Sequence, residues 1–173
     1  LWGRICYHLF FLGLPIRIPE NNKENEKICK MVKNKDYDIV WIDKGHTILP
    51  STLKYIKKIS PNTIIVSYSP DNMALRHNQT QQYLETIPLY DYFFTNKSYI
   101  LDNMRKLGAK NIFFVNNSYE ETFHHPYNLT EQERIELGGD VGFVGSWEQE
   151  RCDSILYLAD NEIKVGVFEI GRG

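Results

Sequence analysis

The sequence predicts an α/β protein built on a parallel, doubly wound sheet. Short apolar runs of strand length alternate with segments whose apolar residues recur at helical spacing. The run Asp38–Asp43 is almost continuously apolar, which is typical of a parallel strand covered on both faces. Late in the chain, the apolar run 140–144 ends in Gly145-Ser146 and a helical pattern follows. This succession is typical of the strand, turn and helix that open a nucleotide-binding unit.

The other elements follow from the same patterns of spacing. Strands are predicted at 16–19, 38–43, 63–68, 90–95, 111–115 and 140–144. Helices are predicted at 1–14, 21–34, 50–60, 99–107 and 130–137 and after Trp147, with 76–86 a helix or an ordered loop and 120–128 irregular. Gly108 suits the C′ position behind the helix at 99–107. Thr130 and Glu133 have the spacing of a capping box.

These elements predict one complete domain and the beginning of another. Residues 1–128 form the first domain, 129–139 a linker helix, and 140–173 the start of a second domain that the sequence does not complete. We also expect the chain to be cut at both ends, because Leu1 is not an initiator methionine and residues 169–173 contain no natural stop.

Composition narrows the class of protein and of partner. The chain has 173 residues, of which 42% are hydrophobic and 24% charged, as in ordinary globular proteins. A formal net charge of -2 gives no electrostatic reason to expect nucleic acid as a partner. Lys54, Lys57 and Lys58 lie at helical spacing and are better explained by a solvated helix face than by a phosphate site.

Cysteine usage and hydropathy indicate the compartment. Cys6, Cys29 and Cys152 are scattered and have neither metal-ligand nor disulfide spacing, which favours a reducing compartment. The apolar segment Ile5–Leu14 is too short to span a bilayer, and no clean signal peptide is visible. We therefore expect a cytoplasmic protein without a membrane span.

The loops that leave the predicted strands carry the polar residues. In an open parallel sheet, ligands bind beyond the carboxyl ends of the strands. Five such loops combine lysine, histidine, aspartate and small polar groups, whereas the strands themselves are apolar: Lys44-Gly45-His46, Ser69-Pro70-Asp71, Asn96-Lys97-Ser98, Asn116-Asn117-Ser118 and Gly145-Ser146-Trp147. Exposure to solvent is enough to explain the polar residues of any single loop. The occurrence of such residues in all five loops favours a ligand site.

The order of these segments resembles that of a known family. The segments are Asp-Ile-Val-Trp-Ile-Asp-Lys-Gly at 38–45, Ile-Val-Ser-Tyr-Ser-Pro-Asp-Asn at 65–72, Tyr-Asp-Tyr-Phe-Phe-Thr at 90–95, Leu-Gly-Ala-Lys-Asn-Ile at 107–112, His-His-Pro at 124–126, and Asp-Val-Gly-Phe-Val-Gly-Ser at 140–146 followed by Arg151. Together they resemble the GT-B-fold glycosyltransferases, and among these the spore-maturation (CgeB-like) group. The resemblance runs from about Asp38 to the end of the chain.

The resemblance implies two Rossmann-like domains with the active site in the cleft between them. The N-terminal domain takes the acceptor, which is a sugar, a protein or a small molecule, and the C-terminal domain takes the nucleotide-sugar donor. The implied reaction is a hexosyl transfer that needs neither a metal nor another cofactor. Helix N-termini and basic side chains stabilise the diphosphate leaving group.

Individual residues inherit expected roles from the resemblance. Gly145 and Ser146 match the loop beside the donor diphosphate, and Arg151 stands where a guanidinium pairs with a phosphate. Asp71 is the candidate catalytic carboxylate, as a general base or as the acceptor of a hydrogen bond from a sugar hydroxyl. Lys44, Gly45 and His46 are expected to contact substrate.

Each of these residues also has a plainer interpretation. Asp71 also suits an N-cap or an Asx turn after Pro70. Lys44 and His46 are ordinary loop residues, and Arg151 is an ordinary surface residue of a first helical turn. His124 and His125 are best explained as linker contacts, because no third ligand supports a metal.

Two other functions remain open. The first is a nucleotide-sugar epimerase on the same scaffold. The second is a non-catalytic Rossmann-like binding or regulatory domain, such as a receiver module. Asp43 ends a strand, as the phosphoacceptor of a receiver would, but the acidic pair expected upstream is not seen.

Overall fold

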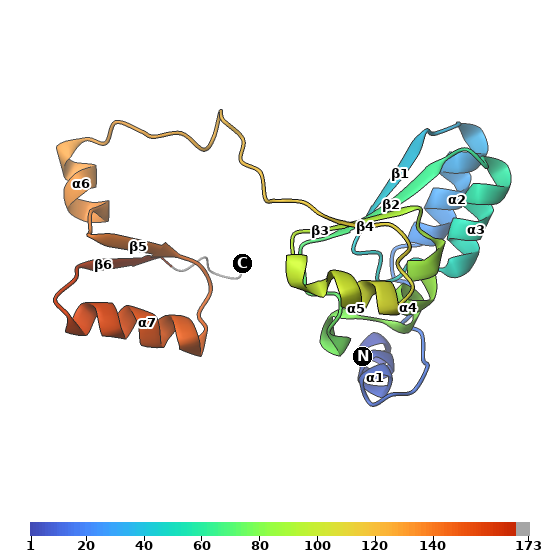
Figure 1. The fold of residues 1–173 in the computed structure, drawn as a ribbon, viewed down its shortest axis with the longest axis horizontal. Coiled ribbons are helices and arrows are strands. Elements are labelled where there is room, and N and C mark those ends of the chain that lie inside the picture. Colours follow the sequence, from blue (N-terminus) through green and yellow to red (C-terminus); the bar gives the residue numbers. More distant parts are fainter. Residues whose placement is uncertain (169–173) are drawn as a thin grey trace. The chain divides into compact units, whose positions relative to one another are not determined.

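A computed structural model describes residues 1–168 as two compact units, Leu1–Ser118 and a second unit that begins at Tyr119 (Figure 1). The predicted boundary lies later, at 128. The difference arises because residues 119–130 form neither a helix nor a strand and group with the second unit. Residues 169–173, predicted as part of the second domain, lie outside the described residues.

The first unit contains a four-stranded parallel sheet. Its strands are β1 (Ile39–Asp43), β2 (Ile64–Ser69), β3 (Tyr92–Thr95) and β4 (Ile112–Phe114), in the spatial order β1-β2-β3-β4. Neighbouring strands are in register, so Asp43 lies opposite Tyr68, which lies opposite Phe94, which lies opposite Phe113. The prediction of an α/β protein with a parallel sheet is confirmed, and the arrangement is compatible with a Rossmann-like fold.

Helices and short 3₁₀ turns connect these strands. They are α1 (Trp2–Phe11), α2 (Glu24–Asn34), α3 (Pro50–Ile59), η1 (Arg76–Asn78), α4 (Gln81–Thr86), η2 (Ile87–Leu89), η3 (Ser98–Ile100) and α5 (Leu101–Lys106). Apolar residues of α2, α3, α4, η2, η3 and α5 pack with one side of the sheet into a single core that includes Leu53, Ile56, Ile65, Phe93 and Met104. Figure 1 shows α2 and α3 beside β1 and β2, and α5 beside β4.

The opposite face of this sheet is uncovered among the described residues. Trp41 and Tyr92 alternate along their strands with less exposed neighbours and remain 55% and 38% exposed, and Phe113 of β4 is 48% exposed. The four strands follow one another in order, and right-handed connections between consecutive parallel strands place their helices on one face. The sheet that residues 1–168 form is therefore wound in one direction only, which corrects the doubly wound prediction.

Most predicted elements of this unit are present, with two differences. The segment 16–19 is not a strand; the backbone N–H and C=O of Ile18 are bonded to the side-chain amide of Gln82, which replaces a strand partner. The segment 99–107 starts as the 3₁₀ turn η3 and continues as α5. Gly108 follows with a φ of +107°, as predicted for a C′ glycine.

The second unit is a strand–helix–strand unit preceded by a short helix. It contains α6 (Glu131–Leu137), β5 (Val141–Val144), α7 (Gln149–Asp160) and β6 (Val165–Phe168), with β5 and β6 parallel. The capping box of Thr130 and Glu133 at the start of α6 is confirmed. β6 was not predicted; a strand as short as Val-Gly-Val-Phe, with a glycine inside it, has a weak periodic signal.

Among residues 1–168, no helix combines the length and the apolar character that crossing a bilayer requires.

Candidate functional site

The carboxyl ends of β1 and β2 hold an ion pair between two of the predicted site residues. Lys44 Nζ lies 2.5 Å from Asp71 Oδ2, and the two side chains are 46% and 39% exposed. Lys44 leaves β1 and Asp71 follows β2, so the parallel register of these strands brings the two loops together. Asp71 is not the N-cap or Asx residue of its turn, since Asn72 accepts the Ala74 N–H instead.

Left-handed backbone conformations shape the β1 loop. Lys44 has a φ of 57°, uncommon for a residue with a Cβ, and Gly45 follows with a φ of 72°. A Cβ on Gly45 would lie 2.8 Å from the hydroxyl oxygen of Tyr90. Only glycine fits both the conformation and this close approach. Gly45 thus permits the loop conformation from which the Lys44 side chain reaches Asp71.

His46 is held within the protein rather than presented to solvent. Its Nε2 lies 2.9 Å from the carbonyl oxygen of Asn78, and its own carbonyl accepts a hydrogen bond from the Thr80 hydroxyl. Desolvation lowers the pKa of His46, although the bond to Asn78 and the charge of Asp71 act in the opposite direction. The ring is therefore neutral at pH 7, donates from Nε2, and keeps Nδ1 as an acceptor.

A hollow of about 500 Å³ opens at this end of the sheet. The β1 loop lines it on one side, including Lys44 and His46, and α2 lines it on the other with Glu24 and Lys27. Charges of both signs are thus present in a concave site, a combination that suits a polar ligand with several hydrogen-bonding groups.

The second unit contains the other three predicted site residues, at the turn from β5 to α7. Arg151 Nη1 donates to the carbonyl of Ser146 at 3.1 Å, and Nη2 lies 3.3 Å from Glu148 Oε2. Gly145 packs against Phe143, whose Cζ atom would lie 2.9 Å from an added Cβ. A hollow of about 170 Å³ is lined by these residues.

The start of α7 carries opposing charges. α7 has twelve residues, and no side chain caps its first backbone N–H groups. Such N–H groups and the Arg151 guanidinium attract an anion. Glu148 and Glu150 lie at the same helix start and repel an anion. A phosphate that binds Arg151 therefore has to displace Glu148 from it.

The remaining polar loops make local contacts of their own. Asn96 donates to Asn117 at 2.7 Å beyond β3 and β4. His124 accepts the backbone N–H of Glu120, and the His125 ring lies 4.2 Å from that of Tyr127, so both histidines make local contacts in the irregular segment. Within residues 1–168, no group of three or more His, Cys, Asp or Glu side chains is arranged to hold a metal ion.

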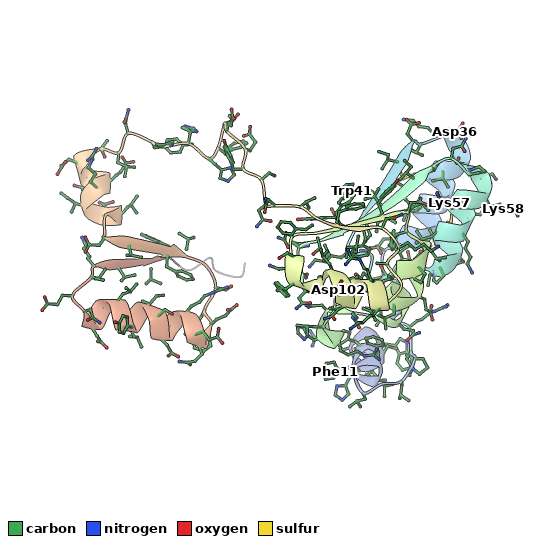
Figure 2. The ribbon with its side chains drawn as sticks, viewed as in Figure 1. Phe11, Asp36, Trp41, Lys57, Lys58 and Asp102 are labelled. Atoms are coloured by element: carbon green, nitrogen blue, oxygen red, sulfur yellow. The ribbon has the colours of Figure 1, made fainter. Side chains whose placement is uncertain are left out.

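Tyr90 and Trp41 are two residues of interest that the sequence interpretation missed. Tyr90 lies against the Gly45 turn from inside the core, and nothing in its local sequence signals that contact. Trp41 lies on the uncovered face of β1 (Figure 2), next to the carboxyl ends of the strands. The alternation of residues along a strand offered a signal for Trp41, because Ile39, Trp41 and Asp43 share one face.

Comparison with known proteins found no match, either among protein-family models or among curated proteins.

Proposed function

We propose that the chain is part of a GT-B-type glycosyltransferase, which moves a sugar from a nucleotide-sugar donor to an acceptor hydroxyl without a metal cofactor. The observation that carries the proposal is the Lys44–Asp71 ion pair at the carboxyl ends of β1 and β2. Two residues expected to act on the acceptor side, separated by 27 positions in the sequence, are paired at the edge where parallel sheets bind ligands.

The chemistry assigned to the first unit is proton removal from the acceptor. The acceptor oxygen forms a bond to the anomeric carbon of the sugar while the bond from that carbon to the diphosphate breaks. Asp71 takes the hydroxyl proton, and Lys44 orients the carboxylate until then. His46 is fixed behind this pair and contributes its Nδ1 as a hydrogen-bond acceptor.

The chemistry assigned to the second unit is binding of the leaving diphosphate. The Arg151 guanidinium offers two parallel N–H donors, and the uncapped start of α7 adds backbone N–H groups. The tight turn at Gly145 and Ser146 supports this assignment, because the βα units that bind nucleotides begin with such a turn.

The test is a titration of the purified chain with a panel of nucleoside diphosphates and nucleotide sugars, monitored as a thermal shift and by calorimetry. Binding to the native state raises its stability by about 2.7 kcal/mol at a ligand concentration 100 times the Kd. We expect one nucleotide to bind, Arg151→Ala to weaken binding at least tenfold, and Arg134→Ala to leave it unchanged. Arg134 is the matched control, an exposed arginine on α6.

The proposal also predicts transfer of labelled sugar from the bound donor, with a loss on Asp71→Asn. Nucleotide binding without sugar transfer to any acceptor, but with isomerisation of the donor, would favour the epimerase. Binding without either reaction would favour a non-catalytic domain. If no nucleotide binds, the transferase proposal fails.

A further inference from the structure

The carboxyl end of the uncovered sheet face contains a second hollow, which shares Trp41 with the hollow beside Lys44. Its volume is about 490 Å³. Its floor consists of aromatic side chains from three adjacent strands, and its rim consists of the polar residues that follow β4: Trp41, Tyr68 and Phe94 in the floor, Asn116, Asn117 and Ser118 in the rim. The Lys44, Asp71 and Arg151 roles described above use none of these residues.

The floor consists of neighbouring aromatic rings, of which Tyr68 is tilted by 35° to Trp41. Trp41 Nε1 donates to Asp43 Oδ1 at 2.8 Å, which fixes the indole on the sheet. The rings of Trp41 and Phe94 are parallel to within 7°, with centroids 6.0 Å apart, and Tyr68 lies 6.0 Å from Trp41. Trp41 nevertheless remains 55% exposed. An aromatic surface of fixed orientation is thus open to a ligand.

The rim supplies hydrogen-bonding groups that still have capacity. Asn96 donates its Nδ2 to Asn117 Oδ1 at 2.7 Å. Asn96 Oδ1 is buried and has no hydrogen-bond partner among the described residues. The Asn117 amide nitrogen donates no hydrogen bond within residues 1–168 and lies at the hollow. The Asn96 oxygen is buried and Asn96 does not line the hollow, so the unused amide donor beside the aromatic floor comes from Asn117.

We propose that this hollow binds a neutral sugar ring, so that the acceptor of the proposed transferase is a carbohydrate. Its role as the acceptor site rests on the proposed function; its affinity for sugar does not. The C–H bonds on one face of a pyranose carry partial positive charge and stack on the negative face of an aromatic ring. The hydroxyl groups around the ring edge then pair with the amides of Asn117 and Asn116.

The charge of the hollow selects a neutral ligand. All the described residues that line it are uncharged, so a phosphate or a nucleotide would find no cation there. An apolar protein segment would cover the aromatic floor, but it would leave the amides of the rim without partners, which costs free energy on burial. A sugar ring satisfies both the aromatic floor and the rim.

The test measures binding of neutral oligosaccharides of glucose and of N-acetylglucosamine to the purified chain, by calorimetry and by tryptophan fluorescence. We expect Trp41→Ala to weaken binding at least tenfold and Asn117→Ala to weaken it several-fold. Trp2→Ala is the matched control, because Trp2 is also exposed, at 65%, and lies on α1. It should change the affinity less than twofold.

A second variant distinguishes loss of the binding surface from misfolding. Trp41→Phe keeps an aromatic face and loses only the bond to Asp43, so it should retain more affinity than Trp41→Ala. Circular dichroism and the urea midpoint of each variant report whether the sheet is intact. The proposal fails if none of these oligosaccharides binds, or if Trp2→Ala weakens binding as much as Trp41→Ala.

Self-association is the alternative outcome. If the chain dimerises reversibly at rising concentration and Trp41→Ala abolishes the dimer, a second copy covers this face and the sugar site is disproved. Failure of the proposed function is measured separately, by nucleotide titration of the Arg151 site. Sugar binding without nucleotide binding would therefore leave this inference standing while the transferase proposal falls.

Discussion

Lys44 and Asp71 form an ion pair of 2.5 Å that joins the carboxyl ends of β1 and β2. Lys44 reaches its partner from a left-handed backbone conformation, which Gly45 continues. Strain of this kind persists only where the surroundings enforce it, and here Tyr90 supports the turn from the core side. The loop thus holds the pair in place. Substitutions of single residues can measure what the pair and its turn contribute to stability.

The first prediction concerns the energy of this pair. Asp71→Asn should lower the free energy of unfolding by about 1 kcal/mol or less, because exposed ion pairs contribute little in water. Urea denaturation at low and high salt measures it. Asp102→Asn is the control, since Asp102 pairs with Arg105 on α5 but its side chain is 85% exposed. A loss for Asp71→Asn that is much larger and independent of salt would mean that the carboxylate supports the fold and is not available to a substrate.

The second prediction concerns the Gly45 turn. Gly45→Ala should cost about 1–2 kcal/mol for the left-handed conformation and about 1–3 kcal/mol more for overlap with the Tyr90 hydroxyl. Gly13→Ala separates the two costs, because Gly13 has a φ of 100° and no atom within 4 Å of an added Cβ. Tyr90→Phe should recover part of the second cost. Equal losses in unfolding free energy for the two glycine variants would contradict the contact.

The third prediction concerns alkaline pH. Burial raises the pKa of Tyr90 to about 12 and shifts that of Tyr83 upward as well, from an ordinary value of 10.0. A raised folded pKa means that this part of the stability is complete below pH 10 and declines as the pH rises toward 12. The Tyr83→Phe/Tyr90→Phe double variant should flatten the decline, measured by urea denaturation at several pH values.

At neutral pH the same double variant tests whether these two hydroxyl groups are satisfied. The Tyr83 hydroxyl is buried without a hydrogen-bond partner among the described residues, and the Tyr90 hydroxyl lies close only to the hydroxyls of Thr86 and Ser67, so removal of both should change the unfolding free energy by less than about 1 kcal/mol. Tyr99→Phe is the control, because Tyr99 is 69% exposed. A clear loss of stability at neutral pH would show that the buried hydroxyls have a partner, such as a bound water.

The fourth prediction concerns the capping box of α6. The Thr130 backbone N–H and then its hydroxyl lower the pKa of Glu133. The helix should therefore be stabilised above the ordinary pKa of Glu133 and fray as the pH falls through the lowered value. Cα chemical shifts of Ile135 report this. Thr130→Ala should reduce the helicity at all pH values, whereas Glu133→Gln should keep the cap and remove its pH dependence. Glu136→Gln serves as the control.

Most strands and helices could be predicted because their signals are local. Apolar runs marked β1 to β4 to within about two residues, and Thr130 and Gly108 marked helix ends through capping chemistry that depends on neighbours in sequence. The strand at 16–19 was predicted wrongly for the opposite reason. Its backbone groups are bonded to Gln82, a partner 64 positions away for Ile18, which no local pattern reveals.

The candidate site could be predicted only in part. Placing residues after parallel strands sufficed to nominate Lys44 and Asp71, because such ends always meet at one edge of a sheet. It did not show that the two form a pair, that His46 bonds to Asn78 within the protein, or that Arg151 bonds to Ser146. These contacts depend on loop conformation and on distant partners.

The sequence by itself determined the alternation of strands and helices, the parallel sheet and the edge at which polar loops gather. Periodicity and turn chemistry encode these features over a few residues. Only the tertiary structure decided which face of the sheet the helices cover. The run Ile39–Ile42 is apolar on both sides, and consecutive strand order left Trp41 and Phe113 on the open one. Strand order is a property of long-range pairing, and apolar residues on both faces carry no information about it.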